Sequence, residues 1–193
     1  MVRYIVGAVA LVCAASLQTM PVMAQQIFSA YSSFEADKTC KHSKGRDVED
    51  YGSWVCPGQA GLIVHLSAGD QRMQVSFGRN RRAAADEHAA SQTFPGFNSV
   101  YKGTVEWRME KLPSGEVRPF ATILRWTTRT TPDAERDDGK STGQTFVVTR
   151  LNPGGVCHVG YVDARSPGAN EAARKLADEK ARKFKCGVDD PQK

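Results

Sequence analysis

The sequence is poor in the features that most readily assign a protein to a class. Outside its first two dozen residues it has no apolar run near the roughly 20 residues that a membrane-spanning helix needs, so we expect no stable membrane insertion of the processed chain. It has no Cys-x-x-Cys pair, which argues against a zinc ribbon and against a thioredoxin-type redox site. It shows no internal repeat and no shift in composition, which indicates one domain rather than several.

The apolar segment that is present lies at the N-terminus. Arg3 precedes an almost uninterrupted apolar run over residues 4–17, and Val22-Met23-Ala24 then supplies residues that a signal peptidase accepts. This layout predicts a signal peptide over residues 1–24 and a single domain over residues 25–193, exported to the periplasm or secreted. A retained membrane anchor is the alternative, disfavoured because the run is short. Cys13 follows a bulky residue rather than the small one that lipid attachment requires, so we assign it to the leader.

The excess of basic residues is small. Lys and Arg number 26 against 21 Asp and Glu, and loss of Arg3 with the leader lowers the formal charge of +5 by one. A charge of this size does not mark a nucleic-acid-binding protein, which clusters its Lys and Arg on one face. Together with export, it predicts that nucleic acid is not a partner.

Three pairs of segments alternate apolar and polar residues on either side of turn residues, and each pair predicts an antiparallel hairpin. The pairs are residues 62–66 with 72–77, 104–109 with 120–130, and 145–150 with 156–164. In the second hairpin we expect Phe120, Leu124 and Trp126 to share one side of the returning strand. Such alternation is typical of antiparallel sheets with one solvated face. The fold class is therefore predicted to be mainly β, an antiparallel sandwich or half-open barrel of about 7–8 strands.

Two segments outside the hairpins are predicted to be helical. Residues 79–92 are rich in alanine and predict a short helix, although the arginines at its start oppose the helix dipole. Residues 168–186 carry small and apolar residues at helical spacing, after a Ser166-Pro167 start signal and before Gly187 as a stop signal. The alanines on that stripe predict that the C-terminal helix packs closely on the sheet. Residues 131–143 predict a polar loop.

Four cysteines follow the leader, Cys40, Cys56, Cys157 and Cys186, and an even number in an oxidising compartment predicts two disulfides with three possible pairings. The last strand rises roughly 23 Å beyond Cys157 at ~3.3 Å per residue. The helix then returns roughly 26 Å at ~1.5 Å per residue, which brings Cys186 back beside Cys157. We therefore predict the disulfide Cys157–Cys186 and, by elimination, Cys40–Cys56.

No metal or cofactor site is predicted. Acidic residues between Asp133 and Asp138 alternate as they do in calcium loops, but an EF-hand needs Gly at its sixth position and Glu at its twelfth. Those positions hold Asp138 and Gln144, so a solvated loop is the better interpretation. The Gly154-Gly155 pair precedes a predicted strand rather than a helix, so it offers no helix N-terminus to a phosphate.

The residues best suited to binding a partner are basic and aromatic side chains near predicted turns. They are the arginines Arg79, Arg81 and Arg82, which lie within four positions, and the aromatics Phe94, Phe97 and Trp54. The arginines can meet carboxylate, phosphate or an acidic protein surface, and loop aromatics can anchor a partner. The competing interpretation is a solvated charge run, with the aromatics packed over the core.

Together these features predict an exported, non-enzymatic protein that recognises the surface of another protein or an envelope polymer, as an inhibitor or accessory binding protein does. The alternative is a small periplasmic hydrolase whose catalytic residues come from distant strands, with His65, His158, Glu106 and Asp163 as the first suspects. A purely structural role in the envelope is the third hypothesis.

Overall fold

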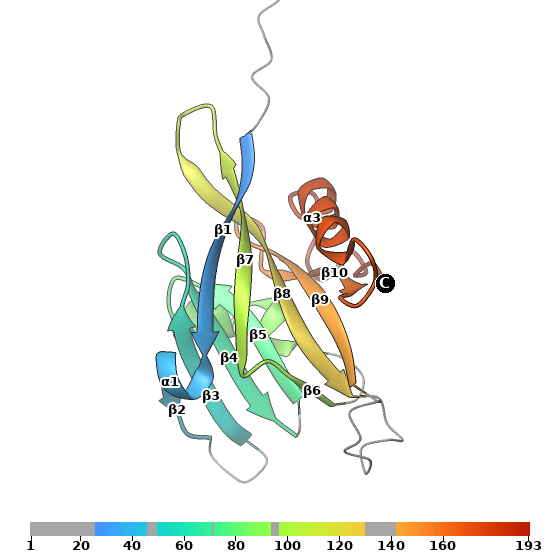
Figure 1. The fold of residues 1–193 in the computed structure, drawn as a ribbon. Coiled ribbons are helices and arrows are strands. Elements are labelled where there is room, and N and C mark those ends of the chain that lie inside the picture. The colour runs from blue at the N-terminus through green and yellow to red at the C-terminus, as the bar shows by residue number, and fades with distance from the viewer. Residues whose placement is uncertain (1–25, 46–49, 71, 94–96, 130–141) are drawn as a thin grey trace, which may run out of the picture.

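The computed structural model of the chain describes residues 26–45, 50–70, 72–93, 97–129 and 142–193 (Figure 1). The predicted signal peptide lies outside these residues, and so does nearly all of the predicted polar loop. The described elements are β1 (Gln26–Glu35), α1 (Ala36–Thr39), β2 (Lys41–Ser43), β3 (Asp50–Pro57), β4 (Ile63–Gly69), β5 (Arg72–Gly78), α2 (Arg81–Ala85), the 3₁₀ helix η1 (His88–Ser91), β6 (Phe97–Ser99), β7 (Lys102–Lys111), β8 (Val117–Arg129), β9 (Thr142–Arg150), β10 (Cys157–Asp163) and α3 (Ala169–Lys180).

The strands form two antiparallel sheets (Figure 1). The larger has the order β1-β7-β8-β9-β10 with β6 paired to β8, and the smaller has the order β2-β3-β4-β5. The three predicted hairpins are present as β4–β5, β7–β8 and β9–β10. The mainly β, antiparallel fold class is therefore confirmed, and residues 26–57 add three strands that the alternation did not predict.

The first of these additional strands, β1, forms an edge of the larger sheet. It pairs with β7 over its whole length, from Gln26 opposite Lys111 to Glu35 opposite Lys102. Its serines bond to polar groups of β7, Ser29 to Glu106 and Arg108, Ser32 to Trp107 and Ser33 to Thr104, so the strand has only a weak apolar alternation of its own. Pairing with a strand some seventy residues away, rather than local pattern, accounts for β1.

The main core lies between the two sheets, because the alternation of both sheets directs apolar side chains inward. Trp54, Leu66 and Phe77 of the smaller sheet are buried together with Trp107 and Trp126 of the larger one. The ring of Phe77 meets that of Trp107 edge to face, with centroids 5.4 Å apart. The molecule is thus a sandwich in which the aromatic residues of both sheets fill the space between them.

A bulge in the β7–β8 hairpin redirects Phe120. Arg108 pairs with Ala121 while the next residue, Met109, pairs with Pro119, so Phe120 is one residue in excess on β8. Phe120 consequently packs in the cluster under α3, whereas Leu124 and Trp126 lie in the core between the sheets. The expectation that these three residues share one side was wrong, because a bulge interrupts the period of two.

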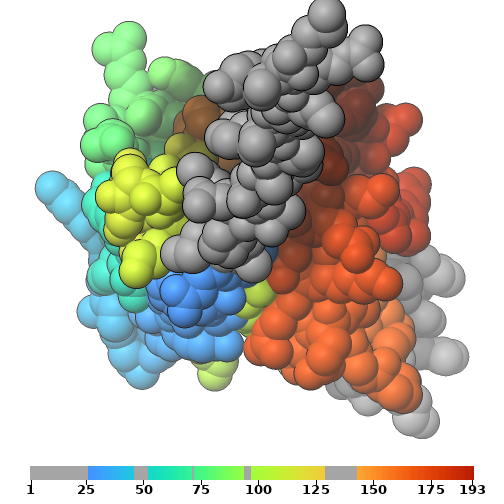
Figure 2. Space-filling view, turned by 90° about the horizontal axis from the view of Figure 1, so that it is seen from above, coloured from blue at the N-terminus to red at the C-terminus, as the bar shows by residue number. Residues whose placement is uncertain are grey.

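Helix α3 packs on the outer face of the larger sheet through small residues, as predicted. Ala169, Ala173, Ala177 and Ala181 are buried there in a second apolar cluster with residues of β8, β9 and β10. Figure 2 shows this C-terminal part, in orange to red, as one block beside the blue start of β1. The helix is shorter than the predicted 168–186, because it begins after Gly168, which has a φ of 71°, and ends at Lys180.

The face of the larger sheet under α3 carries charged residues. Glu106, Arg108 and Glu110 of β7 are all buried there. Arg108 donates to both carboxylate oxygens of Asp178 on α3, at 2.9 and 2.7 Å, and Arg174 on α3 pairs with Glu106 at 2.6 Å. The expected solvated face is therefore wrong for this strand, since the helix covers it and supplies the partners that buried charges require.

The segment predicted as one helix over residues 79–92 is two short pieces. Asn80 caps α2, its side chain accepting a hydrogen bond from the backbone N–H of Ala83. The chain then turns at Asp86 and continues from His88 as η1. The side chain of Glu87, between the two pieces, bonds to the β9–β10 loop instead of staying on a helix surface.

The C-terminal tail returns to the free edge of β10. Gln192 donates to the carbonyl of Val159 and accepts from the N–H of Tyr161, each at about 2.9 Å or less. Such cover blunts a sheet edge that another chain could pair with. Among the described helices, none has the length and apolar character needed to cross a membrane.

The close packing of α3 can be tested with two neighbouring alanines. Ala173 is fully buried while Ala172 is exposed. Ala173→Leu overpacks the helix–sheet contact and is expected to lower the free energy of unfolding by about 1–3 kcal/mol. Ala172→Leu is expected to change it by about 0.5 kcal/mol or less. Urea unfolding compares the two variants, and equal effects would show that α3 does not pack through its alanine stripe.

Candidate functional site

A groove opens between the two sheets at the end where the β7–β8 and β9–β10 loops lie, and we call it the inter-sheet groove. Its volume is about 570 Å³. Residues from four segments, 60–62, 77–83, 116–119 and 151–156, line it together with Glu87. The groove thus collects loops that are far apart in the sequence, which is where rigid β scaffolds usually place their binding residues.

The groove has an apolar floor and a polar rim. Leu62 and Val117, with Ala60 and Ala83, contribute the accessible apolar surface. The nearly buried Phe77, Leu151 and Val156 lie at its base. The rim carries charged and amide side chains, which are Arg79, Asn80, Glu87, Glu116, Arg118 and Asn152. Ligand sites in proteins typically combine predominantly apolar lining with a few polar groups in this range of volume.

Glu87 holds one wall of the groove in place. One of its carboxylate oxygens accepts from the side-chain amide of Asn152 at 2.7 Å, and the other accepts from the backbone N–H of Val156 at 2.8 Å. The carbonyl oxygen of the Asn152 side chain in turn accepts from the N–H of Gly155 at 2.8 Å. Hydrogen bonds of Glu87 therefore hold the loop between β9 and β10 against the segment between α2 and η1.

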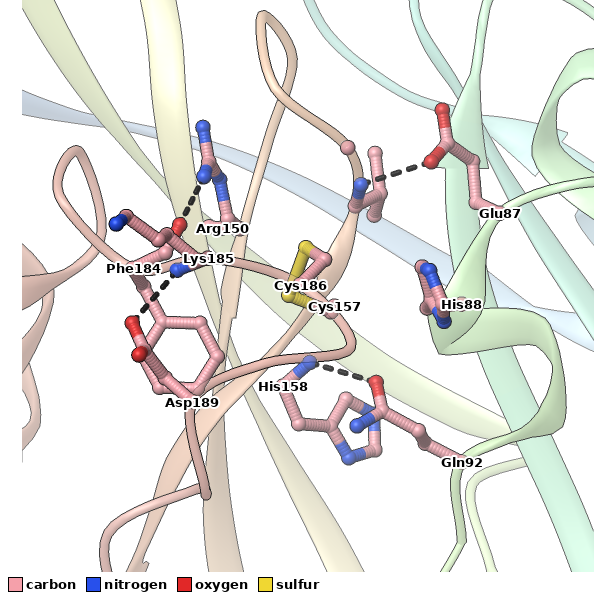
Figure 3. Close-up of a disulfide and its surroundings, with 12 residues drawn as sticks. Glu87, His88, Gln92, Arg150, Cys157, His158, Phe184, Lys185, Cys186 and Asp189 are labelled. Atoms are coloured by element: carbon pink, nitrogen blue, oxygen red, sulfur yellow. Dashed lines mark hydrogen bonds between the residues drawn. A yellow bond between two sulfur atoms is a disulfide. The ribbon is translucent and has the colours of Figure 1, made fainter.

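The disulfide Cys157–Cys186 supports the same wall from behind. Gly155 has a φ of 93°, and a Cβ placed on it would lie 3.2 Å from the sulfur of Cys186, so only glycine fits this position. Arg150 donates to the carbonyl oxygen of Phe184 (Figure 3) and to that of Pro153, which joins the C-terminal segment to the loop. The β9–β10 loop thus packs against the C-terminal segment and is hydrogen-bonded to it through Arg150.

Arg79 is the rim cation that has no ion-pair partner among the described residues. No carboxylate of the described residues lies within ion-pair distance of it, whereas Arg118 pairs with the buried Glu110 at 2.8 Å. Glu87 is already engaged by the β9–β10 loop. The groove therefore offers an apolar floor beside one guanidinium that is available to an acidic ligand.

The other two arginines of the predicted cluster lie outside the groove. Arg81 and Arg82 are exposed on α2. Arg81 donates to the hydroxyl of Ser43 at 3.5 Å, and Arg82 lies 4.0 Å from Asp86. The structure thus separates Arg79 from its neighbours, because Asn80 caps the helix and the chain changes direction there.

The predicted aromatic residues do not form one surface. Trp54 is buried, with its ring stacked on that of His42 at 4.7 Å and its indole N–H donated to Asp37 at 3.3 Å. Phe97 is half-buried at the start of β6. Phe94 lies outside the described residues. Whether any of them contacts a partner remains a prediction.

Both predicted disulfides are present. Cys157 and Cys186 have Cα atoms 5.7 Å apart, and Cys40 and Cys56 have Cα atoms 4.3 Å apart. The first pair forms although α3 has only 12 residues, because the turns that follow the helix carry the chain the rest of the way to Cys186.

The four residues suspected of catalysis lie in separate places. His65 faces away from the core on the smaller sheet, where burial and then the charge of Arg81 lower its pKa. Glu106 lies under α3, and Asp163 at the end of β10 pairs with Arg165 at 3.1 Å. His158 is buried in the larger sheet, with its Nδ1 3.1 Å from the Tyr161 hydroxyl. These four do not meet in one site.

The chain contains one match to the Gly-x-Ser-x-Gly pattern of α/β hydrolases, over residues 139–143. In those enzymes the serine sits on a turn that follows a strand and opens a helix. Here Ser141 lies outside the described residues, and the residues that follow it form strand β9 instead of a helix. The helix that follows the nucleophilic serine in α/β hydrolases is therefore replaced here by a strand.

No group of three or more His, Cys, Asp or Glu side chains within the described ranges is arranged to hold a metal ion. The acidic segment from Asp133 to Asp138 lies outside those ranges. That this segment is a solvated loop rather than a calcium site therefore stays a prediction.

Comparisons with known proteins supply no relative from which a role can be taken. No protein-family model matches the chain, and neither do any curated protein or solved structure. The functional argument therefore depends on the geometry of the described residues.

The buried His158 predicts a pH dependence of stability. Burial lowers its pKa from 6.5 to about 4, so the unfolded chain takes up a proton in this interval and the folded chain does not. Its contribution to stability is complete above about pH 6.5 and declines by up to about 3 kcal/mol as the pH falls towards 4. Urea unfolding at about pH 7 and about pH 4.5 should show a smaller loss for His158→Gln than for the wild type.

The exposed His88 provides the control, since His88→Gln should retain the wild-type loss of stability between the two pH values. An equal loss in the wild type and in His158→Gln would contradict the assignment of this dependence to His158.

Proposed function

We propose that this chain is an exported, non-enzymatic recognition protein, periplasmic or secreted, which binds another protein through the inter-sheet groove. The two disulfides support export, because such bonds form and persist in oxidising compartments. The N-terminal layout of Arg3, an apolar run and Val22-Met23-Ala24 supports a leader that takes it there.

The observation that carries the proposal is the pairing of an apolar floor with Arg79. A guanidinium without an internal carboxylate partner, beside concave apolar surface, suits a ligand that carries both an apolar group and an acidic one. The wall formed by residues 151–156 is fixed by Glu87 and the disulfide before any partner arrives. A preformed site loses less conformational entropy on binding, which favours affinity.

A polypeptide segment fits this groove better than an envelope polymer does. A loop of a partner protein can place one apolar side chain on Leu62 and Val117 and a neighbouring Asp or Glu against Arg79. The C–H faces of sugar rings are broad and flat, so a polymer of sugars would fill the concave apolar floor less well than a single apolar side chain does. The exposed Arg81 and Arg82 extend the basic surface next to the groove towards an acidic partner.

The test begins with the oxidised, processed protein as bait in an envelope extract and with identification of the protein retained. Affinity for that protein is then measured by calorimetry. Arg79→Glu reverses the rim charge and Val117→Asp places a charge in the groove, and each is expected to weaken binding about tenfold or more. Arg81→Ala combined with Arg82→Ala should weaken capture without lowering the melting temperature.

The matched control is Lys175→Glu, which reverses an exposed charge on α3, away from the groove. It is expected to bind as the wild type does. If both groove variants retain wild-type affinity for the retained protein while staying folded, the groove is not the recognition surface.

A further inference from the structure

A second concave surface lies on the opposite side of the larger sheet, beyond the first turns of α3. It consists of two adjoining hollows of about 430 and 310 Å³. They share three lining residues, Lys102, Arg125 and Thr127, so they form one elongated surface. We call it the cationic furrow, and none of its lining residues lies in the inter-sheet groove.

Two cations, Lys102 and Arg125, lie at the centre of the furrow, while its lining as a whole carries as many carboxylates as cations. Neither Lys102 nor Arg125 has a carboxylate of the described residues within ion-pair distance, and both line both hollows. The carboxylates of the furrow are already engaged within the protein. Glu106 pairs with Arg174 at 2.6 Å, Glu35 pairs with Lys38 at 2.8 Å, and Asp37 accepts from Trp54 at 3.3 Å.

Arg125 is held in position before a ligand binds. Its guanidinium carbon lies 4.8 Å from the ring centroid of Phe146, and its Nη1 donates to the side chain of Gln144 at 2.9 Å. This combination of a cation–π contact and a hydrogen bond restricts the rotamers of an otherwise exposed side chain. Its remaining N–H groups are available to an anionic oxygen.

Each hollow has one exposed tyrosine in addition. Tyr31 lines the larger hollow and is 52% exposed, and Tyr101 lines the smaller one and is 40% exposed. Gln144, Asn170 and Thr127 supply neutral donors and acceptors between them. The furrow thus presents cations at its middle, aromatic surface in both halves and polar groups suited to hydroxyls.

These features point to a chain-like ligand that bears both carboxylates and hydroxyls. A single small anion would need only Lys102 and Arg125, and it would leave both hollows empty. A polyphosphate carries no hydroxyl groups to donate to the side-chain oxygens of Thr127 and Asn170, and it has no apolar face for a tyrosine ring. A chain of sugar acids has all three kinds of group.

We propose that the cationic furrow binds an acidic polysaccharide, with one sugar carboxylate between Lys102 and Arg125 and the flanking sugar rings against Tyr31 and Tyr101. The furrow lies apart from the inter-sheet groove, so this binding is a second activity and does not depend on the proposed capture of a protein. An exported protein with both sites can hold a protein partner while attached to an acidic polymer.

Binding of a defined hexamer of galacturonic acid, measured by calorimetry on the oxidised protein, tests the proposal. Its fully methyl-esterified counterpart has the same chain without the charges, and a polyphosphate of similar length has the charges without the sugar. We expect the acidic hexamer to bind, the ester to bind at least tenfold more weakly, and the polyphosphate to bind more weakly than the acidic hexamer.

Lys102→Gln combined with Arg125→Gln is expected to reduce binding of the acidic hexamer at least tenfold, and Tyr31→Ala to reduce it severalfold. Lys111→Gln, at the other end of the same strand, is the control and should bind as the wild type does. Absence of binding by the acidic hexamer, equal binding of the ester, or tighter binding of the polyphosphate would each overturn the proposal. Arg79→Glu should leave this binding unchanged, which separates its failure from that of the protein-binding groove.

Discussion

The fold depends on attachment of the C-terminal segment to the charged face of the larger sheet. Glu110 of β7 is only 1% exposed, and its partners are Arg118 on the neighbouring strand and Arg182 just after α3, at 2.8 and 3.6 Å. A buried carboxylate without such partners would be strongly destabilising. The disulfide Cys157–Cys186 fixes the end of this segment to the last strand. It thereby helps to keep Arg182 beside the buried carboxylate of Glu110.

Both proposed binding surfaces follow from this attachment. The inter-sheet groove owes one wall to the β9–β10 loop, which packs against Cys186 and is bonded through Arg150 to Phe184. The cationic furrow begins where α3 stops covering the sheet, and Arg174 of the helix pairs with Glu106, the carboxylate of the furrow that lies beside α3. The proposed binding residues therefore lie at the borders of the C-terminal segment that covers the sheet. The ion pairs beneath α3 stabilise the fold.

The sequence predicts those parts of the fold that depend on neighbouring residues, namely the three hairpins and the disulfide Cys157–Cys186. The hairpins were found because apolar alternation and turn residues occur together, and Cys157–Cys186 was found because strand and helix lengths limit where the chain returns. Alternation assigned Glu106 and Arg108 to one face of a strand, but it does not show that a helix covers that face. The bulge at Phe120, the pairing of β1 and the groove lining depend on distant segments, so only Arg79 of the groove was singled out from the sequence.

Amide hydrogen exchange of the oxidised protein, compared with the Cys157→Ala, Cys186→Ala double variant, tests the role of the C-terminal attachment most directly. The amides of Gly155 and Val156 donate to Asn152 and Glu87 in the wall of the groove. Loss of the disulfide should accelerate their exchange and that of α3, while the β4–β5 hairpin on the other sheet keeps its protection. Unchanged protection of Gly155, Val156 and α3 in the variant would contradict the account.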